Sequence, residues 1–136
     1  MKRPQGHDDS VFIINVSGGK DSTACILAMR EAEIECRYVF ADTGWEMPQT
    51  YEYLAYLERK LGIAIDRVGR PGGMVALIES ERAFPNPRVS WCTDKLKIVP
   101  LRRYFKQIAE ESDCDAVSIV GIRAEESARR AEMPEF

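Results

Sequence analysis

The sequence predicts one α/β domain built on a doubly wound, mainly parallel sheet flanked by helices. Short apolar runs rich in β-branched residues alternate with helical segments, and this alternation implies right-handed crossovers between parallel strands. The chain has 136 residues, 45% hydrophobic and 30% charged, which is typical of one globular domain. In such sheets ligands bind beyond the carboxyl ends of the strands, so the residues that follow each strand are the candidates for function.

The expected elements follow from apolar patterning and from glycine and proline positions. Residues 1–10 are polar and are expected to be a flexible lead-in to a single domain at 11–136. Pro48 suits the first turn of a helix and Gly62 suits its end, whereas Pro100 either kinks its helix or opens the second half. We expect strands buried on both faces at 11–16, 35–40, 63–68 and 116–120, helices at 21–31, 48–61, 74–80 and 93–108, and a loop at 83–88.

Composition and charge exclude several classes of protein. The formal net charge of −3 gives no bulk attraction for nucleic acid. No apolar run is long enough to span a membrane, and the first ten residues lack the apolar stretch of a signal peptide, so we expect a cytoplasmic protein with no membrane partner. His7 is the only histidine, no Cys-x-x-Cys pair occurs, and the four cysteines are scattered, so we expect no metal site and no disulfide framework: Cys25, Cys36, Cys92 and Cys114.

The most informative segment is the glycine-rich turn after the first strand. Two adjacent glycines let the backbone approach an anion closely. The first amides and the dipole of the following helix then favour negative charge at that point. Hydroxyl groups and one lysine add further donors, so the turn predicts a phosphate site made of Ser17, Gly18, Gly19, Lys20, Asp21, Ser22 and Thr23.

Three alternatives for this turn are weaker. A Walker-type loop needs Ser or Thr after the lysine, where Asp21 stands, and a glycine where Ile14 stands. The dinucleotide fingerprint needs separated glycines and a third one. An ordinary capped Gly-Gly turn accounts for fewer of the residues. The pattern Ser-Gly-Gly-x-Asp-Ser fits throughout, and it resembles the pyrophosphate loop (PP-loop) of the ATP pyrophosphatase superfamily, which includes phosphoadenosine phosphosulfate (PAPS) reductases.

Three later segments strengthen the resemblance to PAPS reductases. An Asp-Thr-Gly-x-x-x-Pro-x-Thr segment follows the second strand, a Lys-x-x-Pro-Leu element lies within the fourth helix, and a Gly-x-Arg-x-x-x-Ser-x-x-Arg segment follows the last strand. Guanidinium forks suit phosphate or sulfate oxygens, whereas a capped turn and a solvated charged helix are the plain structural alternatives. The resemblance places Asp42, Thr43, Gly44, Lys97, Arg123, Ser127 and Arg130 at the nucleotide.

The resemblance implies a Rossmann-like fold of the adenine nucleotide alpha-hydrolase type and an adenylyl nucleotide, PAPS or ATP, as ligand. The full activity it implies is thiol-dependent reduction of PAPS to sulfite with a thioredoxin-like reductant. The family's nucleophilic cysteine lies in a C-terminal Glu-Cys-Gly-Leu-His segment that these 136 residues do not contain, so the catalytic residue stays unassigned. Cys92 alone matches the iron–sulfur branch, and one cysteine cannot hold a four-cysteine cluster, so no cluster is expected.

Two other functions remain open. The first is an ATP pyrophosphatase or adenylyltransferase in nucleic-acid sulfur modification, which would need Mg²⁺ to offset triphosphate charge. Nucleic acid is expected as a partner only in that case. The second is a non-catalytic nucleotide-binding module. A second copy of the chain, forming a homodimer, is also left open as a partner.

Overall fold

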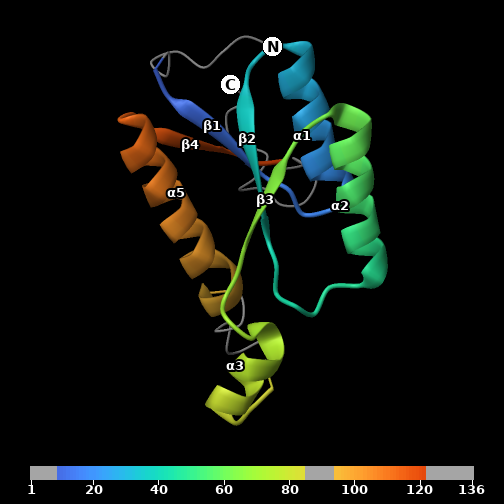
Figure 1. Cartoon of the computed structure of the whole chain (residues 1–136), viewed down its shortest axis with the longest axis vertical. Coiled ribbons are helices and arrows are strands. Elements are labelled where there is room, and N and C mark those ends of the chain that lie inside the picture. The colour runs from blue at the N-terminus through green and yellow to red at the C-terminus, as the bar shows by residue number, and fades with distance from the viewer. Residues whose placement is uncertain (1–8, 85–93, 122–136) are drawn as a thin grey trace, which may run out of the picture.

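The computed structural model describes residues 9–84 and 94–121. A four-stranded parallel sheet forms its centre, in the order β3-β2-β1-β4 (Figure 1). The strands are β1 (Val11–Asn15), β2 (Cys36–Ala41), β3 (Ile65–Val68) and β4 (Ala116–Ile119). The helices are α1 (Lys20–Glu31), α2 (Pro48–Leu61), α3 (Gly73–Glu81) and α5 (Val99–Ser112), and a π-helical turn, η1 (Asp94–Ile98), precedes α5.

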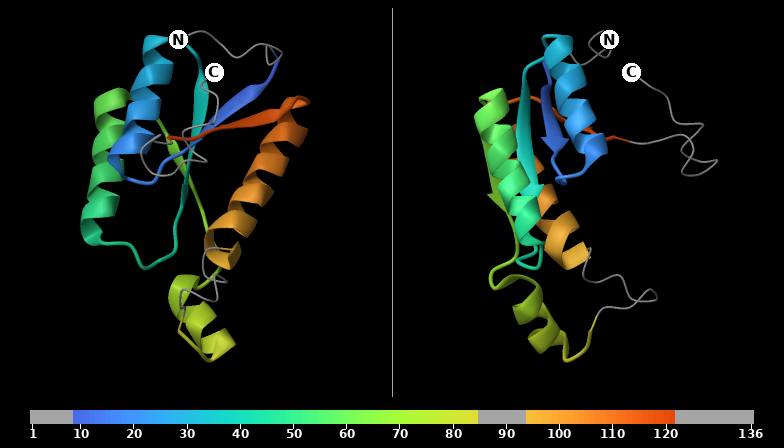
Figure 2. Two further views of the ribbon diagram at one scale, coloured as in Figure 1. Left: turned by 180° about the vertical axis from the view of Figure 1, so that it is seen from behind. Right: turned by 90° about the vertical axis from the view of Figure 1, so that its right-hand side faces the viewer.

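Helices cover both faces of the sheet. Successive residues of β1 point to opposite faces, and since most of them are apolar, each face needs helices to bury it. Phe12 and Ile14 belong to the larger core cluster, together with Ile26 of α1 and Leu54 of α2. Ile13 belongs to a second cluster, which α5 supplies with Tyr104 and Ile108. In Figure 1, α1 and α2 accordingly lie to the right of the strands and α5 to the left, and Figure 2 gives the view from behind and from the side. The predicted doubly wound, Rossmann-like α/β fold is confirmed.

The strand order places a topological switch point beside the first strand. From β1 the chain moves outward in one direction to β2 and β3, and α5 then returns it to β4 on the opposite side of β1. The registers pair Ile14 with Tyr38 and with Ile119, so β1 lies between its two neighbours. The connections that leave β1 and β4 therefore diverge from one point, which is where open α/β sheets bind ligands.

Most predicted element boundaries agree with the structure to within two residues, and three details were wrong. β3 begins at Ile65, because the Ile63 amide still donates to the Glu58 carbonyl in the turn that ends α2. The predicted helical segment at 93–108 is the η1 turn followed by α5, and Pro100 lies in the first turn of α5, which confirms the alternative that it opens the second half. The predicted end was wrong, because α5 extends to Ser112. Thr93 lies outside the described residues.

The third error concerns burial. β1 is buried as expected, but β3 exposes Asp66 and Arg67, and β4 exposes Ser118. These two strands are the edges of the sheet, where the helices cover less of each face. Charged side chains on an edge strand also oppose pairing with another chain. In the described ranges, no helix is long and apolar enough to cross a membrane.

Candidate nucleotide-binding site

The predicted phosphate loop connects the carboxyl end of β1 to the N-terminus of α1. Gly18 has φ of +80°, a left-handed conformation that favours glycine. Gly19 is the residue before the helix, in extended conformation, and no described side chain caps the helix that begins at Lys20. The first amides of a helix have no partner within it, so they and the helix dipole are available to an anion at this end.

Ser22 fixes the shape of the loop. Its hydroxyl accepts hydrogen bonds from the amide and the hydroxyl of Ser17, each at 3.2 Å, and donates to the Gly19 carbonyl at 3.2 Å. The Ser17 hydroxyl also accepts from the Gly19 amide at 3.3 Å. Ser22 is buried, whereas Ser17, Gly19 and Lys20 are exposed. The buried Ser22 side chain therefore anchors the loop on its inner side, and the loop exposes its backbone and the Lys20 ammonium to solvent.

Helix α2 supports the loop from the side. A Cβ atom on Gly18 would lie 3.2 Å from the Thr50 methyl group, so α2 leaves little room there. The Thr23 hydroxyl donates to the Gly19 carbonyl at 3.0 Å and lies 2.9 Å from the Tyr53 hydroxyl. Thr23 was predicted as a phosphate donor, but its hydroxyl is used to tie the start of α1 to α2. No local pattern in the sequence indicates a role for Tyr53, because Thr23 and Tyr53 are 30 positions apart.

The residue that leaves β4 packs against the phosphate loop. A Cβ atom on Gly121 would lie 2.8 Å from the Asp21 carbonyl oxygen and 3.0 Å from the Asp21 Cβ atom. The chain after β4 therefore starts at the N-terminus of α1, which requires glycine at this contact. Arg123, Ser127 and Arg130 follow it and lie outside the described residues, so their predicted role in binding stays a prediction.

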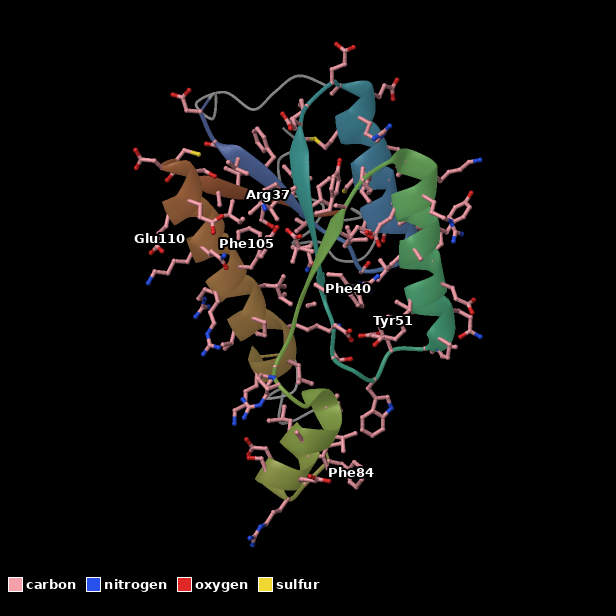
Figure 3. The ribbon with its side chains drawn as sticks, in the orientation of Figure 1. Arg37, Phe40, Tyr51, Phe84, Phe105 and Glu110 are labelled. Carbon is pink, nitrogen blue, oxygen red and sulfur yellow. The ribbon has the colours of Figure 1, made fainter. Side chains whose placement is uncertain are left out.

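The turn after β2 holds its acidic residue in a fixed position. One oxygen of the Asp42 carboxylate accepts from the Gly44 amide at 2.8 Å and from the Tyr51 hydroxyl at 2.7 Å. The hydrogen bond to Asp42 raises the pKa of Tyr51, so the phenol stays a donor. The ring of Tyr51 meets Phe40 edge to face, with centroids 6.2 Å apart (Figure 3). Tyr51 therefore positions Asp42, a role that was not predicted from the sequence.

Thr43 has a structural role in the same turn. It is buried, its hydroxyl donates to Glu46 at 3.0 Å and accepts from the Trp45 amide at 3.2 Å, and its carbonyl accepts from the Met74 amide at 2.8 Å. Of the predicted trio, Asp42 and Gly44 are therefore the residues at the surface of the carboxyl edge of the sheet.

Lys97 belongs to the turn before α5, the helix that packs on the opposite face of the sheet from α1. It is exposed in η1, which precedes α5, whereas the loop leads into α1. Lys95 of the same turn pairs with Glu81 of α3. Within the described ranges, no hydrogen bond or ion pair joins Lys97 to the phosphate loop.

The described cysteines lie away from the loop or are poor nucleophiles. Cys36 begins β2 and Cys114 precedes β4, so both lie at the amino edge of the sheet. Burial and the neighbouring Asp21 carboxylate raise the pKa of the Cys25 thiol, which disfavours the reactive thiolate. Cys92 is outside the described residues. In the part of the chain that is described, no three His, Cys, Asp or Glu side chains gather as metal ligands.

The chain is similar to several uncharacterized proteins. One, from Methanocaldococcus jannaschii, is 32% identical over 120 residues, which cover 88% of this chain and 24% of the relative. A 37.8 kDa protein of Escherichia phage 186 is 30% identical, with 93% of this chain and 52% of the relative covered. A nin region protein of Escherichia phage lambda is 26% identical, with 91% of this chain and 52% of the relative covered. The chain thus spans about half the length of the two phage relatives and about a quarter of the archaeal one.

The comparison with protein families agrees with the geometry of the loop. Residues 12–136 match the phosphoadenosine phosphosulfate reductase domain, so the match includes every strand and helix described above except Val11, the first residue of β1. The chain belongs to the phosphoadenosine phosphosulfate reductase family, within the PP-loop adenine nucleotide alpha-hydrolase-like superfamily.

Proposed function

We propose that this domain binds an adenylyl nucleotide, with the nucleotide phosphates on the loop from Ser17 to Thr23. The observation that carries the proposal is the position of the loop. It joins a central strand to a helix N-terminus that no described side chain caps, at the switch point of the sheet. Backbone amides and the Lys20 ammonium would neutralise the phosphates there. Asp42 and Gly44 would flank the nucleoside, and Arg123 and Arg130 would hold the distal phosphate or sulfate.

The reaction proposed for the complete protein is the reduction of PAPS to sulfite. A cysteine thiolate attacks the sulfur of the sulfuryl group, the bond between that sulfur and the bridging oxygen breaks, and adenosine 3′,5′-bisphosphate leaves. The product is an S-sulfonated cysteine. A thioredoxin-like dithiol then releases sulfite, becomes a disulfide and returns the cysteine to its thiol. Family membership supports this proposal, and the attacking cysteine would come from outside the described residues.

A second candidate is supported by the positions of the cysteines. Cys36 and Cys114 lie at the opposite edge of the sheet, and the pKa of the Cys25 thiol is raised. Such a site suits chemistry that needs no thiol, namely adenylation of a substrate by ATP with release of pyrophosphate, as proposed for nucleic-acid sulfur modification. Mg²⁺ would then accompany the triphosphate.

Calorimetric titration with PAPS, ATP plus Mg²⁺, and GTP tests the binding proposal. Adenine nucleotides are expected to bind and GTP to bind more weakly, and a chain that binds no adenine nucleotide at millimolar concentration would refute it. Sulfite release with thioredoxin then supports the reductase, and pyrophosphate release from ATP supports the adenylyltransferase. Binding without either turnover identifies a nucleotide-binding module.

A further inference from the structure

A pocket lies at the carboxyl ends of β2 and β3. Its volume is about 370 Å³, within the range of roughly 300–1,000 Å³ that small-molecule sites occupy. The lining includes residues that follow β2, the neighbour of β1, and residues that follow β3, one strand further out, so the pocket lies one to two strands from the loop, or roughly 5–10 Å at the usual strand spacing. The lining residues are Asp42, Gly44, Arg67, Val68, Gly69, Arg70, Pro71 and Gly73.

Two arginines give the pocket positive charge. Arg70 is exposed, and within the described ranges no carboxylate pairs with it. The charge of Arg67 is partly neutralised, because its guanidinium lies 3.5 Å from the Glu58 carboxylate of α2. The facing acidic group is Asp42, one of whose oxygens already accepts two hydrogen bonds. The Arg70 guanidinium therefore keeps its donors for a ligand, and the Arg67 guanidinium keeps those that do not face Glu58.

The two turns that line the pocket pack closely against each other. A Cβ atom on Gly69 would lie 2.5 Å from the Asp42 carbonyl oxygen, and one on Gly73 would lie 2.5 Å from the Thr43 carbonyl oxygen, so the turns after β2 and β3 are in direct contact. Helix α3 begins at Gly73, and the amides of Gly73 and Met74 already donate to carbonyls. The helix end thus contributes favourable potential for an anion rather than free donors.

We infer that this pocket is a second anion site, which takes a phosphate group through Arg70 with support from Arg67. A phosphate ligand offers several acceptor oxygens to guanidinium groups and carries up to two negative charges. It therefore matches two arginines better than a ligand with a single carboxylate would. The phosphate could have one of two sources. It is either a phosphate on the ribose of the nucleotide whose 5′ end occupies the loop, or a phosphate of a separate substrate. In the first case the inference rests on the proposed function and deepens it, because Asp42 and Gly44 both line the pocket and flank the proposed nucleoside. In the second case it adds a ligand beyond the nucleotide.

The test uses the whole chain and three probes: ADP, adenosine 3′,5′-bisphosphate, and inorganic phosphate, which is added both to the free protein and to ADP-saturated protein. Arg70→Ala and Arg70→Gln each remove the charge. Arg59→Ala is the control, because Arg59 is exposed at the C-terminal end of α2 and does not line the pocket, and its loss changes the net charge equally. Ionic strength is kept constant, and the melting temperature of each variant shows that it is folded.

We expect both Arg70 variants to lower the affinity for one of the probes by about tenfold, which is the effect of losing one charge-assisted hydrogen bond. Weaker adenosine 3′,5′-bisphosphate binding with unchanged ADP binding identifies the ribose phosphate as occupant. Weaker phosphate binding with both nucleotides unchanged identifies a separate substrate. Arg70 variants that match Arg59→Ala for all probes, or that weaken ADP and the bisphosphate equally, overturn the inference. If the wild type binds phosphate through Arg70 but no nucleotide, the proposed function alone fails.

Discussion

Ser22 holds the phosphate loop in shape through one hydroxyl group. That hydroxyl accepts from the amide and hydroxyl of Ser17 and donates to the Gly19 carbonyl. We predict that Ser22→Ala weakens adenine nucleotide binding by about tenfold, or about 1.4 kcal/mol, because the loop amides lose their common anchor. Titration calorimetry measures the change. Ser112→Ala, at the exposed C-terminal end of α5, is the control, and equal affinities of the two variants would contradict this role of Ser22.

Tyr104 joins α5 to the edge strand through a single hydrogen bond. Its hydroxyl donates to Asp66 at 2.6 Å, and Arg37 lies 3.6 Å from the same carboxylate oxygen. Burial, followed by the bond to Asp66, raises the pKa of Tyr104 from its ordinary 10 to about 12. A raised pKa means that the neutral phenol is stabilised in the folded state. The contribution of Tyr104 to stability is thus complete below about pH 10 and is lost as the pH rises through about 12.

We predict that Tyr104→Phe lowers the free energy of unfolding by about 1 kcal/mol at neutral pH, because the Asp66 carboxylate loses a donor. The difference from wild type should stay constant up to about pH 10 and shrink above it. Urea unfolding at several pH values measures the first effect. Ultraviolet titration of the folded protein should show one phenol ionising near pH 12 that is missing from the variant, and identical titration curves would refute the assignment.

The role of the phosphate loop as an anion site could be predicted from the sequence, but the hydrogen-bond partners of its residues could not. Adjacent glycines, hydroxyls and a lysine before a helix indicate an anion site from local chemistry alone. Tyr51, Tyr53, Arg70 and Gly121 gave no such signal, because each depends on a contact with a distant segment. Thr43 and Thr23 were predicted to touch the nucleotide, and only the structure shows that their hydroxyls are used within the protein.

At the level of helices and strands, prediction succeeded where glycine or proline marks a boundary. Pro48 begins α2 and Gly62 ends it in left-handed conformation, as the sequence indicated. It failed at β3 and at η1. Ile63 and Ala64 look like strand residues, yet the turn that ends α2 uses the Ile63 amide. The π-helical turn leaves no mark in apolar periodicity, because its five residues are too few to show one.

The contact between the turns after β2 and β3 can be tested with two glycine variants. Gly73 has φ of +61° and Gly62 has φ of +63°, so alanine strains the backbone equally at both. A Cβ atom meets the Thr43 carbonyl oxygen at 2.5 Å in the first case and nothing within 4 Å in the second. We predict a loss of about 1 kcal/mol for Gly62→Ala and of about 2–4 kcal/mol for Gly73→Ala, measured by urea unfolding. Equal losses would contradict the prediction, because the turns after β2 and β3 would then separate without a loss of stability.

At the level of the whole molecule, the strand order assembles the site from distant parts of the chain. β1 and β4 are more than 100 positions apart, and their carboxyl ends lie side by side at the switch point. The parallel sheet could be predicted from the alternation of strands and helices, and so could the idea that function follows the strands. The strand order itself could not, because the apolar pattern does not say on which side of β1 the last strand pairs.

Gly121 links these two distant parts directly. Alanine there would place a Cβ atom 2.8 Å from the Asp21 carbonyl oxygen, so either the chain leaving β4 or the start of α1 must move. We predict that Gly121→Ala weakens adenine nucleotide binding by about tenfold, since the loop and the segment after β4 then no longer converge on one ligand. The unfolding free energy should fall by about 1–3 kcal/mol.

The matched control for this variant is Val120→Ala, which changes the preceding residue. The Val120 side chain is 58% exposed, so its truncation should alter neither nucleotide affinity nor stability by more than about 0.5 kcal/mol. Calorimetric affinity and the rise in melting temperature with added nucleotide give two independent readings for both variants. If Gly121→Ala is destabilised but binds nucleotide as Val120→Ala does, the contact is structural only, and the segment after β4 contributes nothing to the nucleotide site.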